Sequence, residues 1–150
     1  MNKTQTPIIA EKIHLIKLDV VQQKIDDLAF KKENEHQLKI GHKFMYNLDD
    51  ELVKIELNFS FDDKEDNQLL FFQIDFHYKV DDLNDYYNLN ETKEPVFYSL
   101  LIVTLLGISL STARGVMFSR LQNIGVDNVI IPVIDPQKIL TQKNSINKNS

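Results

Sequence analysis

Three consecutive runs of the chain alternate apolar and polar residues with a period of two. They are LKIGHKFMY at 38–46, ELVKIELNFSF at 51–61 and QLLFFQIDFHYKV at 68–80. Successive side chains of a strand point to opposite faces, so three such runs in succession predict an antiparallel meander with one buried face. That face is rich in phenylalanine and is expected to supply a large share of the core. Its phenylalanines include Phe59, Phe61, Phe72 and Phe76.

An earlier run, IHLIKLDVV at 13–21, is rich in β-branched residues, which favours a strand. A helix stays open as the alternative, because the apolar residues of 9–20 also fit a helical spacing. The next stretch, 22–36, is polar and contains one apolar group. This group consists of Leu28, Ala29 and Phe30. We interpret 22–36 as a connection that crosses the surface and is held there by the apolar group.

Two apolar residues break the pattern of the third run. Leu69 and Phe71 share a strand face with polar residues. The polar members of that face are Gln73, Asp75, His77 and Lys79. Two neighbouring apolar side chains on a polar face make a small patch, which indicates either a partner or partial cover by the apolar group of 22–36.

The stretch 96–113, VFYSLLIVTLLGISLSTA, contains no charged residue. Its length is at the lower limit for a membrane span, which stays open as an alternative. We prefer a helix that covers the phenylalanine face of the meander. Gly107, with Ser109 and Ser111, is expected to break it, so that a second, amphipathic helix covers 111–124 and ends at Gly125. Pro95 is expected near the first turn of the first helix.

The last part of the chain predicts an extended segment, a short helix and a tail. Residues 126–134 are apolar and contain Pro132, which is typical of an edge or irregular segment. Asp135 followed by Pro136 is a helix start, and that helix is expected to reach about Leu140. We expect a single domain over 1–141 and a disordered polar tail over 142–150.

Composition excludes several functional classes. The net charge is -5, so no basic stripe is expected to bind nucleic acid. The chain has no cysteine, which excludes a disulfide scaffold and a thiol nucleophile and fits a reducing compartment. Charged residues interrupt every apolar run of residues 1–20, so no secretory signal is expected there. These features together predict a cytoplasmic protein.

The sequence indicates no catalytic, metal or cofactor site. The four histidines lie in different segments without ligand spacing, and His42 is interpreted as a core residue. The acidic residues of 62–66 lack the glycine and the spacing of a calcium loop, so they are interpreted as a solvated turn. Ser109 and Ser111 lack the surroundings of a nucleophile. The sequence therefore does not predict an enzyme, and it predicts no cofactor.

The order of these elements resembles the SecB family of protein-export chaperones, over about residues 13–141. The closest local matches are Ala113-Arg114, Ser119-Arg120 and IIPVIDPQKIL at 130–140. The resemblance implies an α+β fold, in which a four-stranded antiparallel sheet has two long C-terminal helices packed on one face. It also implies an ATP-independent holdase that binds unfolded polypeptide and assembles as a homotetramer, a dimer of dimers, without membrane insertion.

The resemblance also implies roles for particular residues. Peptide would bind in a groove formed by Leu28, Phe30, Ile40, Phe44 and Tyr46. Protomers would meet through the first long helix, at Val96, Leu100, Val103 and Leu106. The outer sheet face, with Leu69, Phe71, Gln73 and Asp75, would dock the SecA motor.

Some positions depart from the family pattern. Phe71 lies where the family has a leucine, and Gln73 lies where it has an acid. The tail carries Lys143 and Lys148 and no acid, and the helix junction lacks the family's proline-aromatic step. Binding of unfolded chains therefore carries over better than coupling to SecA. Two alternatives stay open: a chaperone dedicated to one client, such as an antitoxin, and a non-enzymatic module that binds one folded partner.

Overall fold

The computed structural model describes residues 6–26, 28, 30, 36–126 and 131–142. Four long antiparallel strands form one sheet: β1 (Ile13–Ile25), β2 (Gln37–Asn47), β3 (Leu52–Asp62) and β4 (Gln68–Val80). A two-stranded hairpin, β5 (Tyr87–Leu89) and β6 (Pro95–Phe97), precedes the long helix α2 (Ser99–Asn123) and the short helix α3 (Pro136–Gln142). Two short 3₁₀ turns, Ala10–Lys12 and Leu83–Tyr86, complete the described elements.

The strand order in the large sheet is β1-β4-β3-β2, so β1 and β2 are the edges. The meander predicted from period-two alternation is confirmed, with β3 paired to both β2 and β4. The prediction of a strand at 13–21 is confirmed as well, and the helical alternative for that run is wrong. β1 continues to Ile25 because its polar second half pairs with β4 through Gln22↔Gln73 and Lys24↔Phe71.

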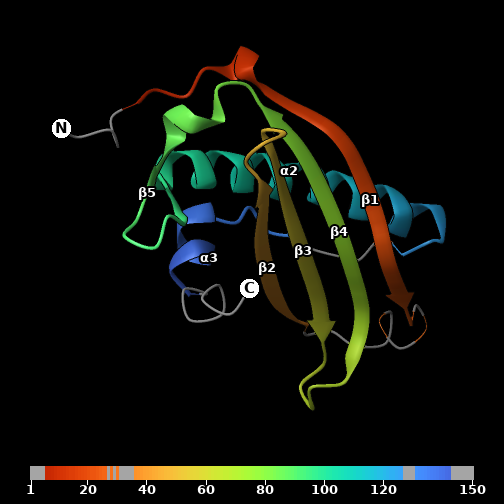
Figure 1. Ribbon diagram of the computed structural model, residues 1–150. Coiled ribbons are helices and arrows are strands. Elements are labelled where there is room, and N and C mark those ends of the chain that lie inside the picture. Colours follow the sequence, from red (N-terminus) through yellow and green to blue (C-terminus); the bar gives the residue numbers. More distant parts are fainter. Residues whose placement is uncertain (1–5, 27, 29, 31–35, 127–130, 143–150) are drawn as a thin grey trace.

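α2 runs across one face of the sheet and makes the fold a two-layer structure (Figure 1). The core lies between the layers. The sheet contributes the inward residues of β3 and β4, which include Phe59, Phe72 and Phe76, all almost fully buried. The helix contributes residues three or four positions apart, a spacing that places them on one face. They include Leu101, Leu105, Met117 and Leu121.

The predicted break at Gly107 is wrong, since α2 is continuous through this residue. A tertiary contact offsets the weak helix propensity of glycine. A Cβ added at Gly107 would lie 3.6 Å from the Pro136 ring, so α3 begins against this turn. Ser109 does not cap a second helix, because its hydroxyl donates to the Leu105 carbonyl oxygen at 2.8 Å. The structure therefore has one long helix and one short helix in place of two long ones.

The ends of the helices follow the chemistry of the sequence. Gly125 adopts a φ of 80°, and the amide of Val126 donates to the Leu121 carbonyl at 2.9 Å, which closes α2. The Gln137 amide donates to the Asp135 carboxylate at 2.9 Å, so the predicted start of the short helix is confirmed. Pro95 lies in β6 and not in the first turn of α2, which is a second correction.

α2 is the helix in the described part of the chain that is long and apolar enough to cross a membrane. Its most apolar window has a mean hydropathy of 1.8, and 39% of that window is buried. A single helix of this kind is weak evidence for a span, because core helices of soluble proteins meet the same criterion. Ala29, residues 127–130 and the predicted tail from 143 onward lie outside the described residues.

One buried hydrogen bond joins the two layers. Burial raises the pKa of Tyr78 to about 12, so its hydroxyl stays protonated and can donate to Ser109 Oγ, 2.7 Å away. Tyr78→Phe is expected to lower the free energy of unfolding by about 1 kcal/mol. Tyr46→Phe, which alters a half-exposed ring on β2, is the control and is expected to change it by less than about 0.5 kcal/mol. Urea unfolding of both variants measures this, and equal effects would contradict it.

Candidate functional site

A cleft of about 520 Å³ lies beside the edge strand β2, between that strand, β6, α2 and α3. Most of its walls are apolar or aromatic: Phe44, Tyr46, Phe97, Ile102, Leu106 and Leu140. Two charged residues also line it, Lys43 on β2 and Glu94 next to β6. This volume lies in the range of pockets that bind small molecules or single side chains of a larger partner.

Phe97 is the centre of an aromatic cluster in this wall. Its ring centroid lies 5.1 Å from that of Phe44 and 5.4 Å from those of Tyr46 and Tyr87. These separations are typical of favourable edge and tilted ring contacts. The β5–β6 hairpin, which carries Phe97 and Tyr87 as a cross-strand pair, is therefore attached to β2 through its side chains.

The hairpin has its own local order. The Tyr98 amide donates to the Tyr86 carbonyl and the Asn90 amide to the Glu94 carbonyl, both at 2.9 Å. The Asn90 side-chain oxygen accepts from the amides of Thr92 and Glu94 at 3.0 and 2.9 Å, an arrangement that organises the turn. Hydrogen bonds within the hairpin and to Tyr86 thus hold the aromatic wall of the cleft in place.

The structure brings together only part of the predicted peptide groove. Phe44 and Tyr46 line the cleft, whereas Ile40 is half-buried further along β2. Phe30 is fully buried near the opposite end of β2, with its ring 6.1 Å from that of Phe61. Leu28 is 68% exposed and does not line the cleft. The five residues therefore do not all line this cleft.

Sequence reasoning missed Phe97, Ile102 and Leu140. Phe97 belongs to the uncharged run 96–113, which was predicted to be helical from its start, whereas the structure places this residue in β6. The available signal was Pro95, because proline favours an extended neighbour and is compatible with the edge of a short hairpin. Leu140 could be placed on a short helix but not beside β2, since sequence pattern does not give the position of α3.

The four residues of the predicted protomer interface do not share one surface of the structure. Val96 lies on β6 and not on the helix, and Leu106 is buried in the core, so neither belongs to an outward helix face. Leu100 is 45% exposed, and Val103 is half-buried. The outward face of α2 also carries Ile108 and Phe118, which are partly exposed.

The outer face of the sheet differs from the predicted patch. Leu69 is 6% exposed and belongs to the core, whereas Phe71 and Gln73 are half-buried. Asp75 is also buried, and its carboxylate lies 3.4 Å from the Lys54 ammonium. The two apolar side chains therefore do not form an exposed pair.

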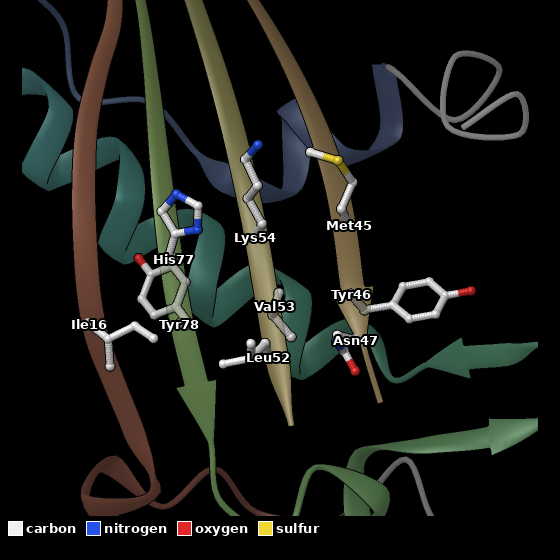
Figure 2. Close-up of a pocket in the computed structure, with 9 residues that line it drawn as sticks. All are labelled: Ile16, Met45, Tyr46, Asn47, Leu52, Val53, Lys54, His77 and Tyr78. Carbon is white, nitrogen blue, oxygen red and sulfur yellow. The ribbon is translucent and has the colours of Figure 1, made fainter. Parts of the chain in front are cut away.

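A second depression, of about 260 Å³, lies on this outer face (Figure 2). It is lined by Ile16 of β1, Met45 of β2, Leu52 and Lys54 of β3 and His77 of β4, among others. Ile16 is the extra residue of a bulge between Leu15 and Lys17, and it is 57% exposed. A bulge turns a side chain away from the regular alternation, which the period-two pattern cannot predict.

The acidic turn at 62–66 is held by local hydrogen bonds. The Asp63 carboxylate accepts from the Asn67 amide and the Glu65 amide at 2.9 Å and from the Asn67 side chain at 3.0 Å. The hydrogen bonds from Asn67 lower the pKa of Asp63. Within the described residues, no group of three or more histidine and carboxylate side chains is placed to hold a metal ion.

The sequence was compared with family models and with curated proteins. No family model matches it, and no curated protein matches it either. The cleft beside β2 is therefore interpreted from its own geometry and chemistry.

Proposed function

We propose that the protein is an ATP-independent holdase that captures non-native polypeptide in the cleft beside β2. The observation that carries this proposal is a largely apolar, aromatic cleft of about 520 Å³ at an open sheet edge. Apolar burial is non-directional, so such a cleft can accept many different side chains. The resemblance of the sequence to the SecB family supports the same function, with one departure: the resemblance implies two long helices, whereas α3 is short.

The energetics of capture fit a holdase that needs no nucleotide. Burial of one large apolar side chain contributes roughly 1.5–3 kcal/mol, which gives weak and reversible binding at a single cleft. Several clefts in one assembly would raise the effective affinity for a long unfolded chain without any new contact. Release then needs no chemical step, only refolding or transfer of the client.

Suppression of aggregation tests the proposal directly. A chemically denatured model protein is diluted into buffer with and without the purified full chain, and light scattering is followed in the absence of nucleotide. The expected result is loss of most of the scattering at a severalfold molar excess of the chain. Unchanged scattering at that excess would contradict the holdase function.

We also propose that copies assemble through the outward face of α2, as a cytoplasmic homotetramer arranged as a dimer of dimers. The support is the run 96–113 without charge and the partly exposed Leu100, Ile108 and Phe118 on this face. A solvent-exposed helix face normally carries charged residues, whereas an interface core is depleted in them.

Ile108→Asp is therefore expected to lower the molar mass in solution. Light scattering should give about four times 17.5 kDa for the parent chain and half of that or less for the variant, because a buried carboxylate opposes assembly. Leu89→Asp on β5, which alters an exposed leucine outside α2, is the control and should keep the parent mass. A monomeric parent chain would contradict the assembly.

A second function is favoured by the outer-face depression at Ile16 and by half-buried Phe71. This function is the docking of one folded partner, and SecA is the first protein to test. A dedicated client, such as an antitoxin, is the other partner to consider. Phe71→Asp is expected to abolish binding of purified SecA in calorimetry and to leave aggregation suppression intact. Absence of SecA binding by the parent chain would exclude the motor as the partner.

A further inference from the structure

We infer that the cleft takes its client as an added strand on the free edge of β2, with a large apolar side chain inside the cleft and a carboxylate opposite Lys43. This inference rests on the proposed holdase function and defines the class of segment that the site selects. The occupant is an extended polypeptide segment in which a large apolar residue neighbours an acidic one.

The direction of the β2 backbone groups follows from the sheet register. The Val80 amide donates to the Glu51 carbonyl at 3.0 Å, at the start of the β3–β4 ladder. Backbone groups of a strand alternate between its two neighbours, so the even-numbered residues of β3 bond to β2. Their partners on β2 are odd-numbered, as in Lys54↔Met45. Even-numbered residues of β2 therefore direct their N–H and C=O groups to the free edge.

Phe44 and Tyr46 are the even-numbered residues of β2 beside the aromatic cluster. Within the residues that the structure describes, no hydrogen bond satisfies their backbone N–H and C=O groups. Such groups are strong donors and acceptors, and an extended segment supplies the matching partners at the right spacing.

The two sheet edges differ in how well they can accept a strand. β2 has 11 residues without proline, and its pairing with β3 has no irregularity. β1 has two register shifts, at Leu15/Lys17 and Val20/Gln22. Bulges, prolines and charged side chains protect an edge from pairing. β2 carries Lys39 and Lys43 but has no proline and no irregularity in its pairing with β3, so it is the more regular of the two edges.

The cleft reaches the backbone of this edge. It is lined by both Lys43 and Phe44, whose side chains point to opposite faces of the sheet because they are consecutive in a strand. A cavity that contacts both must lie against the strand edge between them. A residue of an added strand opposite Phe44 would direct its side chain inward, toward Phe97, Ile102 and Leu140. The β5–β6 ribbon lies at the end of β2, next to Tyr46 (Figure 2).

Charge gives the segment its second feature. Lys39 of β2 is paired with Asp62 at 3.1 Å and Asp66 at 3.4 Å. Lys43 is exposed and lies opposite Glu56 of β3, but the Glu56 carboxylate lies 3.7 Å from the Lys54 ammonium, and Lys43 forms no ion pair with any residue of the described part. Glu94, the other charged residue at the cleft, lies on the β6 side. Residues directly opposite across two strands interact, so a carboxylate next to the inward residue would meet Lys43.

Labelled 12-residue peptides of alternating valine and threonine test this with the full chain by fluorescence anisotropy. One carries a central Glu-Phe-Glu and the other Lys-Phe-Lys. The first is expected to bind about twofold to fivefold more tightly, the usual size of a cross-strand charge pair. Lys43→Glu is expected to reverse the preference. Lys24→Glu, on the exposed side of β1, is the control and should leave it unchanged.

Backbone pairing is tested separately with two N-methylated forms of the Glu-Phe-Glu peptide, one methylated on alternate amides and the other on the remaining ones. A strand uses the amides of one edge only, so one form is expected to lose at least about tenfold in affinity and the other to change little. Equal behaviour of the two forms would overturn strand addition, as would a preference that Lys43→Glu does not alter. A molar mass that Lys43→Glu lowers in the free protein would assign the edge to a second copy instead.

The same samples are measured for aggregation suppression. Aggregation suppression without the charge preference and without the difference between the N-methylated peptides would overturn strand addition, but it would not contradict the holdase function. Absence of aggregation suppression, together with absence of the peptide preferences, would contradict the proposed holdase function as well.

Discussion

Replacement of Leu105 with alanine is expected to lower the free energy of unfolding by about 2–5 kcal/mol. Leu105 is fully buried on the face of α2 that packs against the sheet. Its carbonyl oxygen also accepts from Ser109 and lies 3.4 Å from the Tyr78 hydroxyl, so the neighbouring backbone cannot easily close the cavity. Chemical denaturation monitored by circular dichroism measures the loss.

Leu100→Ala is the matched control in the same helix. The side chain of Leu100 is 45% exposed, so its removal is expected to cost less than about 1 kcal/mol. The comparison is made at a protein concentration at which both variants have the same molar mass, because assembly adds its own stabilisation. Equal losses for the two leucines would contradict the packing of α2 against the sheet.

Phe97→Asp is expected to raise the concentration of chain needed for half-maximal aggregation suppression by about tenfold or more. The substitution removes a ring that contacts three others and places a charge in an apolar wall. Loss of one buried aromatic contact of roughly 1.5–3 kcal/mol corresponds to a factor of this size. The measurement is the light-scattering titration against a denatured model protein.

Leu89→Asp provides the control for a charge on the same hairpin. Leu89 is 56% exposed on β5 and does not line the cleft, so this variant should suppress aggregation like the parent chain. Both variants should keep the parent far-ultraviolet spectrum. A Phe97→Asp protein that is folded and fully active would place the capture site elsewhere.

The sheet could be predicted because its strands obey a simple physical rule. β3 and β4 each bury one face fully, so selection for apolar residues acts at every second position and the period is visible in the sequence. β1 was harder to delimit. It is an edge strand with two bulges and few buried residues, and its polar end from Gln22 onward carries no periodic signal.

The helices illustrate a limit of local propensity. Gly107 and the serines near it read as a break, yet α2 continues because tertiary contacts decide the outcome. The contact between Gly107 and Pro136 joins residues 29 positions apart, and neither one alone indicates the other. Val96 and Phe97 were assigned to the helix for a related reason, since an apolar hairpin and an apolar helix turn look alike over a few residues.

The candidate site was predicted in part. Phe44 and Tyr46 could be placed on the inward face of a strand, and both line the cleft. The remaining walls depend on how β6 and α3 meet the end of β2, which is a property of the packed chain. Phe30 shows the opposite error, because an apolar residue in a polar connection was taken as a groove wall and is instead fully buried.

The bulges of β1 also bear on how far copies of the chain can polymerise. Growth of a fibre by strand pairing needs two edge strands on every subunit that can pair, one with the preceding subunit and one with the next. Register shifts at Leu15/Lys17 and Val20/Gln22 disrupt the β1 edge, whereas the β2 edge is regular. A subunit of this kind can pair with another copy through one sheet edge only. Pairing through β2 would stop at a dimer, so the open strand does not commit the protein to fibre formation.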